Sequence, residues 1–108
     1  MIIDFSHLQT KMVLEGLITQ VVLPFNEETQ RLQKGHCCNI SFEGIQFRNY
    51  GITIEKITHT TLDKLGGMDM FHQGFLYKPA FDDFMQKKGF DVDETILKVD
   101  FKLRELNI

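Results

Sequence analysis

The residues best suited to chemistry in this sequence are neutral hydrogen-bonding groups. Thr19 and Gln20 interrupt the otherwise apolar segment 17–23, and His72 and Gln73 form a second polar pair. A glutamine amide offers a donor and acceptors, but it cannot take up a proton as a carboxylate does. These residues predict hydrogen bonding to a flat, neutral ligand. The alternative is structural: Thr19 and Gln20 divide between a barrel interior, satisfied by backbone, and solvent, and His72 packs or caps near a helix end.

Arg48 and Tyr50 are a second candidate, on a connection between two predicted strands. A tyrosine ring can stack on a base while an arginine contacts phosphate. The alternative is an exposed turn with a half-buried tyrosine.

The two cysteines, Cys37 and Cys38, are adjacent and follow His36. Vicinal disulfides are strained, and the spacing of these residues matches no zinc pattern. On a strand, neighbouring side chains point to opposite faces. We therefore expect two reduced cysteines, one inward and one outward, and neither a metal nor another cofactor.

The elements that must position these residues follow from hydrophobic spacing and from glycines. Residues 4–16 predict a helix that Asp4 or Ser6 caps and Gly16 ends. Further helical segments are predicted at 25–35, 60–75 and 78–90. Strands are predicted at 17–24, 36–42, 45–50, 52–59 and 94–106. Strands that are mostly sequential neighbours indicate an α+β fold, a small, mostly antiparallel β-barrel with helices packed at its ends, as a single domain over 1–108.

Composition narrows the function classes. The chain has 108 residues, is 43% hydrophobic and has a net charge of −3, which is typical of a globular protein and not of one whose whole surface attracts phosphate. A local basic patch stays compatible with these values. No apolar run approaches the roughly 20 residues of a membrane-spanning helix, and the first residues do not resemble a secretory signal, so a cytoplasmic location is expected.

Ten phenylalanines are many for this length, and five of them gather between residues 71 and 90. The two interpretations are a core beneath the barrel or a partly exposed docking surface for another protein.

Three local features resemble the ASCH domain of the PUA-like β-barrel superfamily. The segment "VLEGLITQVVL" follows the ASCH pattern without a gap at the glycine and at the Thr-Gln pair. Lys34-Gly35 matches a turn into the next strand, with His36 where an acid usually stands. "ITIEKITHTTLDKL", then "HQGF" and an aromatic helix, matches the later part of the domain. The resemblance spans nearly the whole chain and implies the same barrel.

The same resemblance argues against an enzyme. In ASCH amidohydrolases that act on acetylated cytidine it implies a lysine, a threonine and a glutamate, and these positions fall at Ile18, Val21 and Gln73. Isoleucine and valine cannot move protons, attack or stabilise an oxyanion, and losing one such group commonly costs on the order of a hundredfold in rate. We therefore expect a degenerate domain, of a kind frequent among phage and prophage genes, without catalysis.

Three hypotheses follow for function. The first is a non-catalytic module that recognises RNA or a nucleotide in the cleft near Thr19 and Gln73. The second is a phage-type adaptor or inhibitor of a host protein, whose acidic face competes with nucleic acid. The third is a residual amidohydrolase. A positive, open cleft would favour nucleic acid and a filled or acidic one a protein; a monomer or a homodimer fits either.

Overall fold

The sheet has five strands, and three of its four neighbouring strand pairs are antiparallel. The computed structural model describes residues 1–106. The strands are β1 (Ile2–Phe5), β2 (Gln20–Pro24), β3 (Cys37–Phe42), β4 (Ile45–Thr61) and β5 (Thr95–Glu105). Their order in the sheet is β1-β3-β4-β5-β2, with β1 parallel to β3 and every other pair antiparallel.

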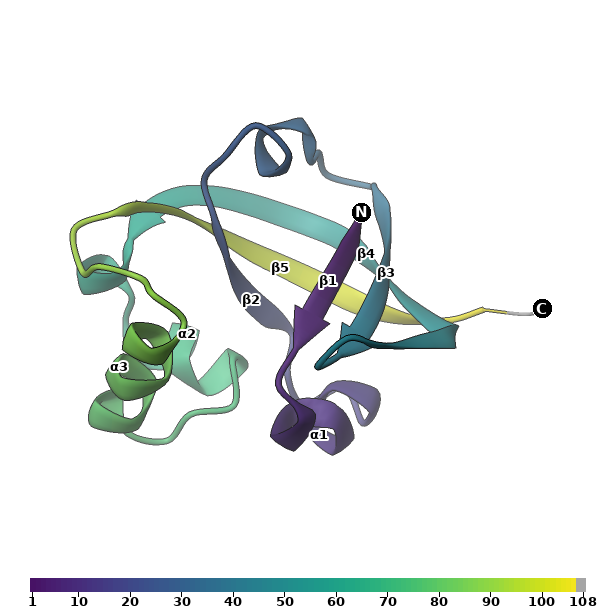
Figure 1. Ribbon diagram of the computed structural model, residues 1–108, viewed down its shortest axis with the longest axis horizontal. Coiled ribbons are helices and arrows are strands. Elements are labelled where there is room, and N and C mark those ends of the chain that lie inside the picture. The colour runs from purple at the N-terminus through teal and green to yellow at the C-terminus, as the bar shows by residue number, and fades with distance from the viewer. Residues whose placement is uncertain (107–108) are drawn as a thin grey trace.

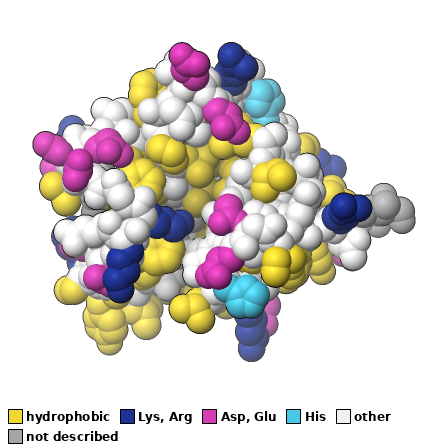
Figure 2. Space-filling view, in the orientation of Figure 1, with side chains coloured by type: hydrophobic (Ala, Val, Ile, Leu, Met, Phe, Trp, Pro, Cys, Tyr) yellow, Lys and Arg dark blue, Asp and Glu magenta, His cyan; other side chains and the backbone are white. Residues whose placement is uncertain are grey.

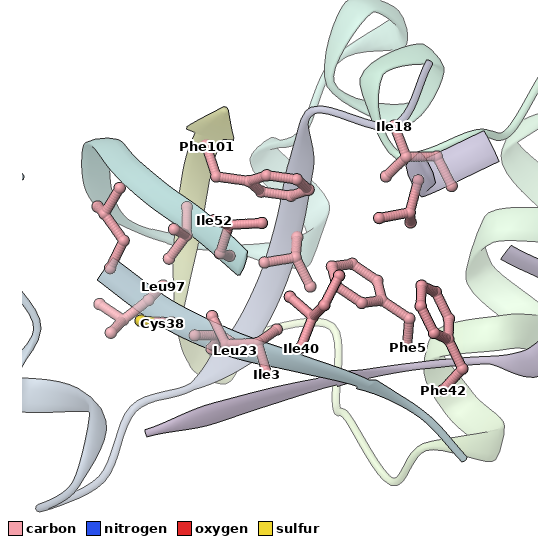
Figure 3. Close-up of a cluster of buried hydrophobic side chains, with 14 residues drawn as sticks. Ile3, Phe5, Ile18, Leu23, Cys38, Ile40, Phe42, Ile52, Leu97 and Phe101 are labelled. Atoms are coloured by element: carbon pink, nitrogen blue, oxygen red, sulfur yellow. The ribbon is translucent and has the colours of Figure 1, made fainter. Parts of the chain in front are cut away.

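The sheet curls into a half-barrel around one apolar core. In Figure 1 the long ribbon of β4 and β5 forms the back of this curl, and the edge strands β1 and β2 lie in front of it. Alternate residues of all five strands meet inside, as Figure 3 shows for Ile3, Leu23, Ile40 and Phe101. This confirms the predicted α+β fold with a mostly antiparallel curled sheet.

Three short helices stand below the sheet in Figure 1, and a few 3₁₀ turns lie in the connections. The helices are α1 (Thr10–Leu14), α2 (Gly67–His72) and α3 (Lys78–Lys87); the turns are His7–Gln9, Thr29–Arg31 and Leu62–Lys64. A second apolar cluster lies between α3 and the sheet, where Phe81 and Met85 pack with Val22 and Ile96. No helix among residues 1–106 has both the length and the apolar character needed to cross a membrane.

The predicted first helix was wrong at its beginning. Residues 2–5 form the edge strand β1, in which Ile3 and Phe5 are buried and pair beside β3. The helical spacing from Phe5 to Leu8 was accidental, because Leu8 is 92% exposed. The chain turns at Ser6, whose hydroxyl accepts from the Leu8 N–H, and Gly16 follows α1 with a positive φ of 76°.

The two strands predicted at 45–50 and 52–59 are one strand, β4, because Gly51 does not break the ladder. Gly51 pairs with both Asn39 and Arg104. A Cβ at this position would lie 3.0 Å from the Cys38 carbonyl oxygen, so the close strand approach accounts for the glycine. The cysteine prediction is confirmed: Cys37 is exposed, Cys38 is buried, and neither forms a disulfide.

Candidate functional site

A surface groove of about 670 Å³ opens between α1 and the end of α2. Its walls come from the chain entering β2 and from the segment between α2 and α3. The lining residues are Met12, Gly16, Leu17, Thr19, Phe71, His72, Gly74 and Leu76. Leu17, Phe71 and Leu76 are more than half exposed, and hydrophobic side chains reach the surface along the lower edge of Figure 2, beneath the helices.

Gly74 lets the chain pass close beneath this groove. Its φ is 89°, and a Cβ built on it would lie 3.0 Å from Ile18 Cδ1 and 3.2 Å from Met12 Cε. A side chain here would meet both contacts and adopt a left-handed backbone conformation that glycine tolerates best. The glycine therefore brings the end of α2 against the entry to β2.

Thr19 and His72 are the polar side chains of the groove. The Thr19 N–H donates to the His72 carbonyl oxygen at 2.9 Å, which joins the entry of β2 to the end of α2. Within residues 1–106 neither the Thr19 hydroxyl nor the His72 ring makes a side-chain hydrogen bond. Both groups are half-buried in the groove wall.

Gln20 and Gln73 do not face the groove, although the sequence placed them among the ligand-binding candidates. Each is only 3% exposed. Gln73 Nε2 donates to Gln20 Oε1 at 2.9 Å, while Gln20 Nε2 donates to Asp100 Oδ1 at 2.9 Å and to Asp69 Oδ1 at 3.3 Å. Lys98 Nζ reaches the same Asp69 oxygen at 3.0 Å. We call these five residues the Gln20 cluster.

The Gln20 cluster also corrects the structural interpretation of that glutamine. The interior polar residue is Gln20, but side chains and not backbone groups satisfy it. Its amide uses its oxygen once and its nitrogen twice, so its hydrogen-bonding capacity is engaged with three neighbours. The role of the two glutamines is to connect α2 with β2 and β5.

Asp69 is the ionised centre of this cluster. Burial by itself raises the pKa of Asp69, but hydrogen bonds from the Gly66 N–H, Lys98 and Gln20 outweigh it, so the pKa lies below the ordinary value. The Gly66 N–H donates to Asp69 Oδ2 at 2.9 Å, which also caps the start of α2. The carboxylate is therefore a structural anion and is not poised to accept a proton.

Arg48 and Tyr50 lie elsewhere, and they lie within strand β4 and not on a connection between two strands as predicted. Tyr50 pairs with Glu105, five residues along β5 from Asp100, the partner of Gln20; this corresponds to roughly 17 Å of strand. Tyr50 is half-buried against the main core, and Arg48 is exposed. Neither contributes to the groove.

The three residues at the positions where the family resemblance implies catalytic groups are buried. Ile18 is 1% exposed and Val21 8%. Ile18 and Gln73 line a smaller hollow of about 170 Å³, which shares Met12 and Gly74 with the groove. Among residues 1–106 no group of three or more His, Cys, Asp or Glu side chains is placed to hold a metal ion.

Comparison with known proteins gives a fold-level result. No family model matches the sequence, and no curated protein does. Among solved structures, the ASCH domain from Lactobacillus crispatus JV V101 superposes with a TM-score of 0.66 at 13% identity, over 89% of this chain and 70% of that one. The chain has the ASCH fold. A DUF984 protein from Enterococcus faecalis V583 gives a TM-score of 0.63 at 16% identity, over 90% and 70% of the two chains.

The ASCH fold thus confirms the architecture that three short sequence features indicated. Of the five phenylalanines between residues 71 and 90, Phe71 is 57% exposed at the groove, while the others pack in or against the second apolar cluster. What sequence reasoning missed is the rest of the apolar lining, above all Leu17 and Leu76. These residues carry no signal of their own, because exposed and buried leucines or phenylalanines look alike in a sequence.

Proposed function

We propose that this chain is a non-catalytic ASCH-fold binding module that takes a nucleobase, in RNA or in a nucleotide, into the groove between α1 and α2. The observation that carries the proposal is the composition of the groove. An apolar hollow of about 670 Å³ with Phe71 at its wall and two unengaged polar side chains, Thr19 and His72, suits a flat heterocycle. Stacking would supply affinity, and the two polar groups would select among bases.

The proposed lack of catalysis is supported by the chemistry of the three positions at which the family resemblance implies catalytic groups. Ile18 and Val21 have no group that can transfer a proton, and the Gln73 amide is committed to Gln20 at 2.9 Å. We therefore expect no hydrolysis of an acetylated nucleoside above the uncatalysed rate, and measurable turnover that Gln73→Leu abolishes would refute this part of the proposal.

A second candidate partner is an apolar segment of another protein, as an adaptor or inhibitor of a host protein would bind. It is favoured by the exposure of Leu8, Leu17 and Leu76, which are 92%, 58% and 78% exposed around the two connected hollows. It is also favoured by the groove lining, which contains no lysine or arginine. From the sequence, either a positive, open cleft or a filled or acidic one was expected. The groove is open but its lining is apolar, so it fits neither description.

Titration of the ¹⁵N-labelled protein with nucleosides separates these candidates. Amide signals of Thr19, His72 and Gly74 should shift at millimolar nucleoside, and Phe71→Ala should weaken binding by roughly tenfold, since stacking on an aromatic ring is worth about 1–3 kcal/mol. Phe25→Ala, which removes an exposed phenylalanine outside the groove, is the matched control. No shift with any base would overturn the nucleobase proposal. Binding of a purified apolar peptide, lost in Leu17→Glu, would then assign the groove to a protein partner.

A further inference from the structure

The outer face of the sheet brings together cations from the middle and from the end of the sequence. Cross-strand pairing places Lys102 of β5 beside Thr53 and Cys37, and Arg104 beside Gly51 and Asn39. The next residue of this face on β5 is Asp100, which pairs with Lys56 of β4. We call Lys56, Lys102 and Arg104 the basic face.

The basic face is exposed, and among residues 1–106 none of its three cations forms an ion pair. Lys56, Lys102 and Arg104 are all exposed to solvent. The ion pairs among residues 1–106 use other lysines, namely Lys11, Lys78, Lys87 and Lys98. In a chain with 15 acidic residues against 12 basic ones, these three neighbouring cations form a local basic patch on one face of the sheet.

Arg104 lies in a cross-strand row, with Gly51 and Asn39, that contains no carboxylate. Its guanidinium donates to the sulfur of Cys37, which is a weak acceptor, and not to an acid. The row formed by Cys37, Thr53 and Lys102 contains no acidic residue. Two acids adjoin Lys56. Its cross-strand partner Asp100 accepts from Gln20, and Glu55 occupies the bulge of β4 beside it.

The face lies next to the groove. Gln20 pairs with Asp100, and Thr19, the residue before it, lines the groove. Lys102 and Arg104 follow Asp100 on the same side of β5 by two and four residues, which is roughly 7 and 14 Å of strand. A single strand whose base entered the groove would have its backbone within reach of these cations.

We propose that the basic face binds the phosphates of a single-stranded nucleic acid whose base occupies the groove. This inference rests on the proposed function, and it selects RNA or another single strand over a free nucleoside as the natural ligand. Charge complementarity is the physical reason, because a cation without an acidic partner gains most from a phosphate. Lys102 and Arg104 would position the strand without reading its sequence.

Fluorescence anisotropy with a labelled single-stranded RNA of about ten nucleotides at several salt concentrations tests the proposal. Lys102→Glu/Arg104→Glu should weaken binding by at least about tenfold at low salt. It should also reduce the slope of log K against log salt by about 1.4, since each phosphate contact on a single strand contributes about 0.7. Lys64→Glu/Lys87→Glu makes the same change in net charge on Leu62–Lys64 and α3, and it should change binding far less.

A second readout uses the thiol on the face. Cys37 is exposed beside Arg104 while Cys38 is buried, so alkylation of the native protein reports on Cys37. Saturating RNA should slow this alkylation, whereas a nucleoside should not.

Several outcomes would overturn the proposal. These are equal weakening by the two double variants, unchanged alkylation of Cys37, or competition by polyglutamate as strong as that by RNA, which would indicate an acidic protein surface as partner. Nucleoside binding in the groove is measured separately and contains no phosphate. If the nucleoside binds but RNA binding ignores Lys102 and Arg104, the basic-face inference fails and the proposed function stands; if no nucleoside binds, the proposed function fails.

Discussion

Helices α2 and α3 are neighbours in the sequence, but they are attached to the sheet by different physical means. Helix α3 buries Phe81 and Met85 completely or nearly so, and Phe75 packs edge-on against Phe81 at 5.4 Å between ring centroids. Helix α2 contains no buried residue. It is connected to the strands through Asp69, the Gln73 side chain and the His72 carbonyl oxygen.

The contrast between the two helices indicates that the stability of the domain and the shape of the groove depend on different interactions. Burial of apolar area is non-directional, so α3 contributes free energy without requiring one orientation. Hydrogen bonds are directional, and those of the Gln20 cluster fix the end of α2 at which Phe71 and His72 form the groove wall. The groove therefore depends on a few polar contacts, while the domain as a whole depends on its apolar clusters.

The largest expected effect is on the α3 side. Phe81→Ala should reduce the free energy of unfolding by about 3–5 kcal/mol, because it leaves a cavity among fully buried side chains. Urea denaturation measures this loss. Where the variant is still folded, the Thr19 amide should lose exchange protection only in step with the global change. A loss below about 1 kcal/mol would mean that the cluster beneath α3 repacks, and apolar burial at α3 would then not be a main source of stability.

Removing the centre of the polar cluster should give a smaller but more local effect. Gln20→Leu leaves Asp100 and Gln73 without buried partners and should cost about 1–3 kcal/mol. The Thr19 N–H donates to the His72 carbonyl oxygen, so its hydrogen exchange reports whether α2 stays attached. We expect its protection to fall by more than the global stability does.

Thr29→Val is the matched control for that experiment. Thr29 is 2% exposed, and its hydroxyl donates to the Pro24 carbonyl oxygen, outside α2. It should lower global stability without a selective effect at Thr19. An equal effect of both variants on the Thr19 amide would show that Gln20 supports the whole domain and not α2 in particular.

The fold was more predictable than the site for a reason that these residues illustrate. Alternation in β5 and the glycine after α1 are local signals, and they indicated the right elements. Strand β1 was missed because its four residues are defined by parallel pairing with a strand more than 30 positions away. Gln20 was predicted to bind a ligand, but it is buried, and its hydrogen bonds go to Asp69 and Asp100, which are 49 and 80 positions distant.

A glycine pair measures how tightly the end of α2 approaches β2. Gly74 and Gly89 both have a φ of 89°, so alanine at either position should cost about 1–2 kcal/mol in backbone strain. Only at Gly74 does the added Cβ meet neighbours, Ile18 Cδ1 at 3.0 Å and Met12 Cε at 3.2 Å. In urea denaturation, the loss in the free energy of unfolding should therefore be about 1 kcal/mol larger for Gly74→Ala than for Gly89→Ala. Equal costs would mean that the side chains of Ile18 and Met12 move aside freely.

The smallest expected effect is a pH dependence confined to α2. The hydrogen bonds that lower the pKa of Asp69 stabilise the folded state above its ordinary value of 3.8, and this contribution is lost as the pH falls through the lower folded value. Exchange protection at Thr19, corrected for global stability, should therefore decrease on acidification below about pH 4 in the natural sequence. In Asp69→Asn this protection should be lower and nearly constant with pH.

Asp83→Asn is the control, because it removes a carboxylate from α3, where Asp83 pairs with Lys87. This variant should leave the acid response of the Thr19 amide unchanged. If Asp69→Asn kept the full acid response, protonation elsewhere would control the attachment of α2, and the Gln20 cluster would lose its anionic centre as an explanation.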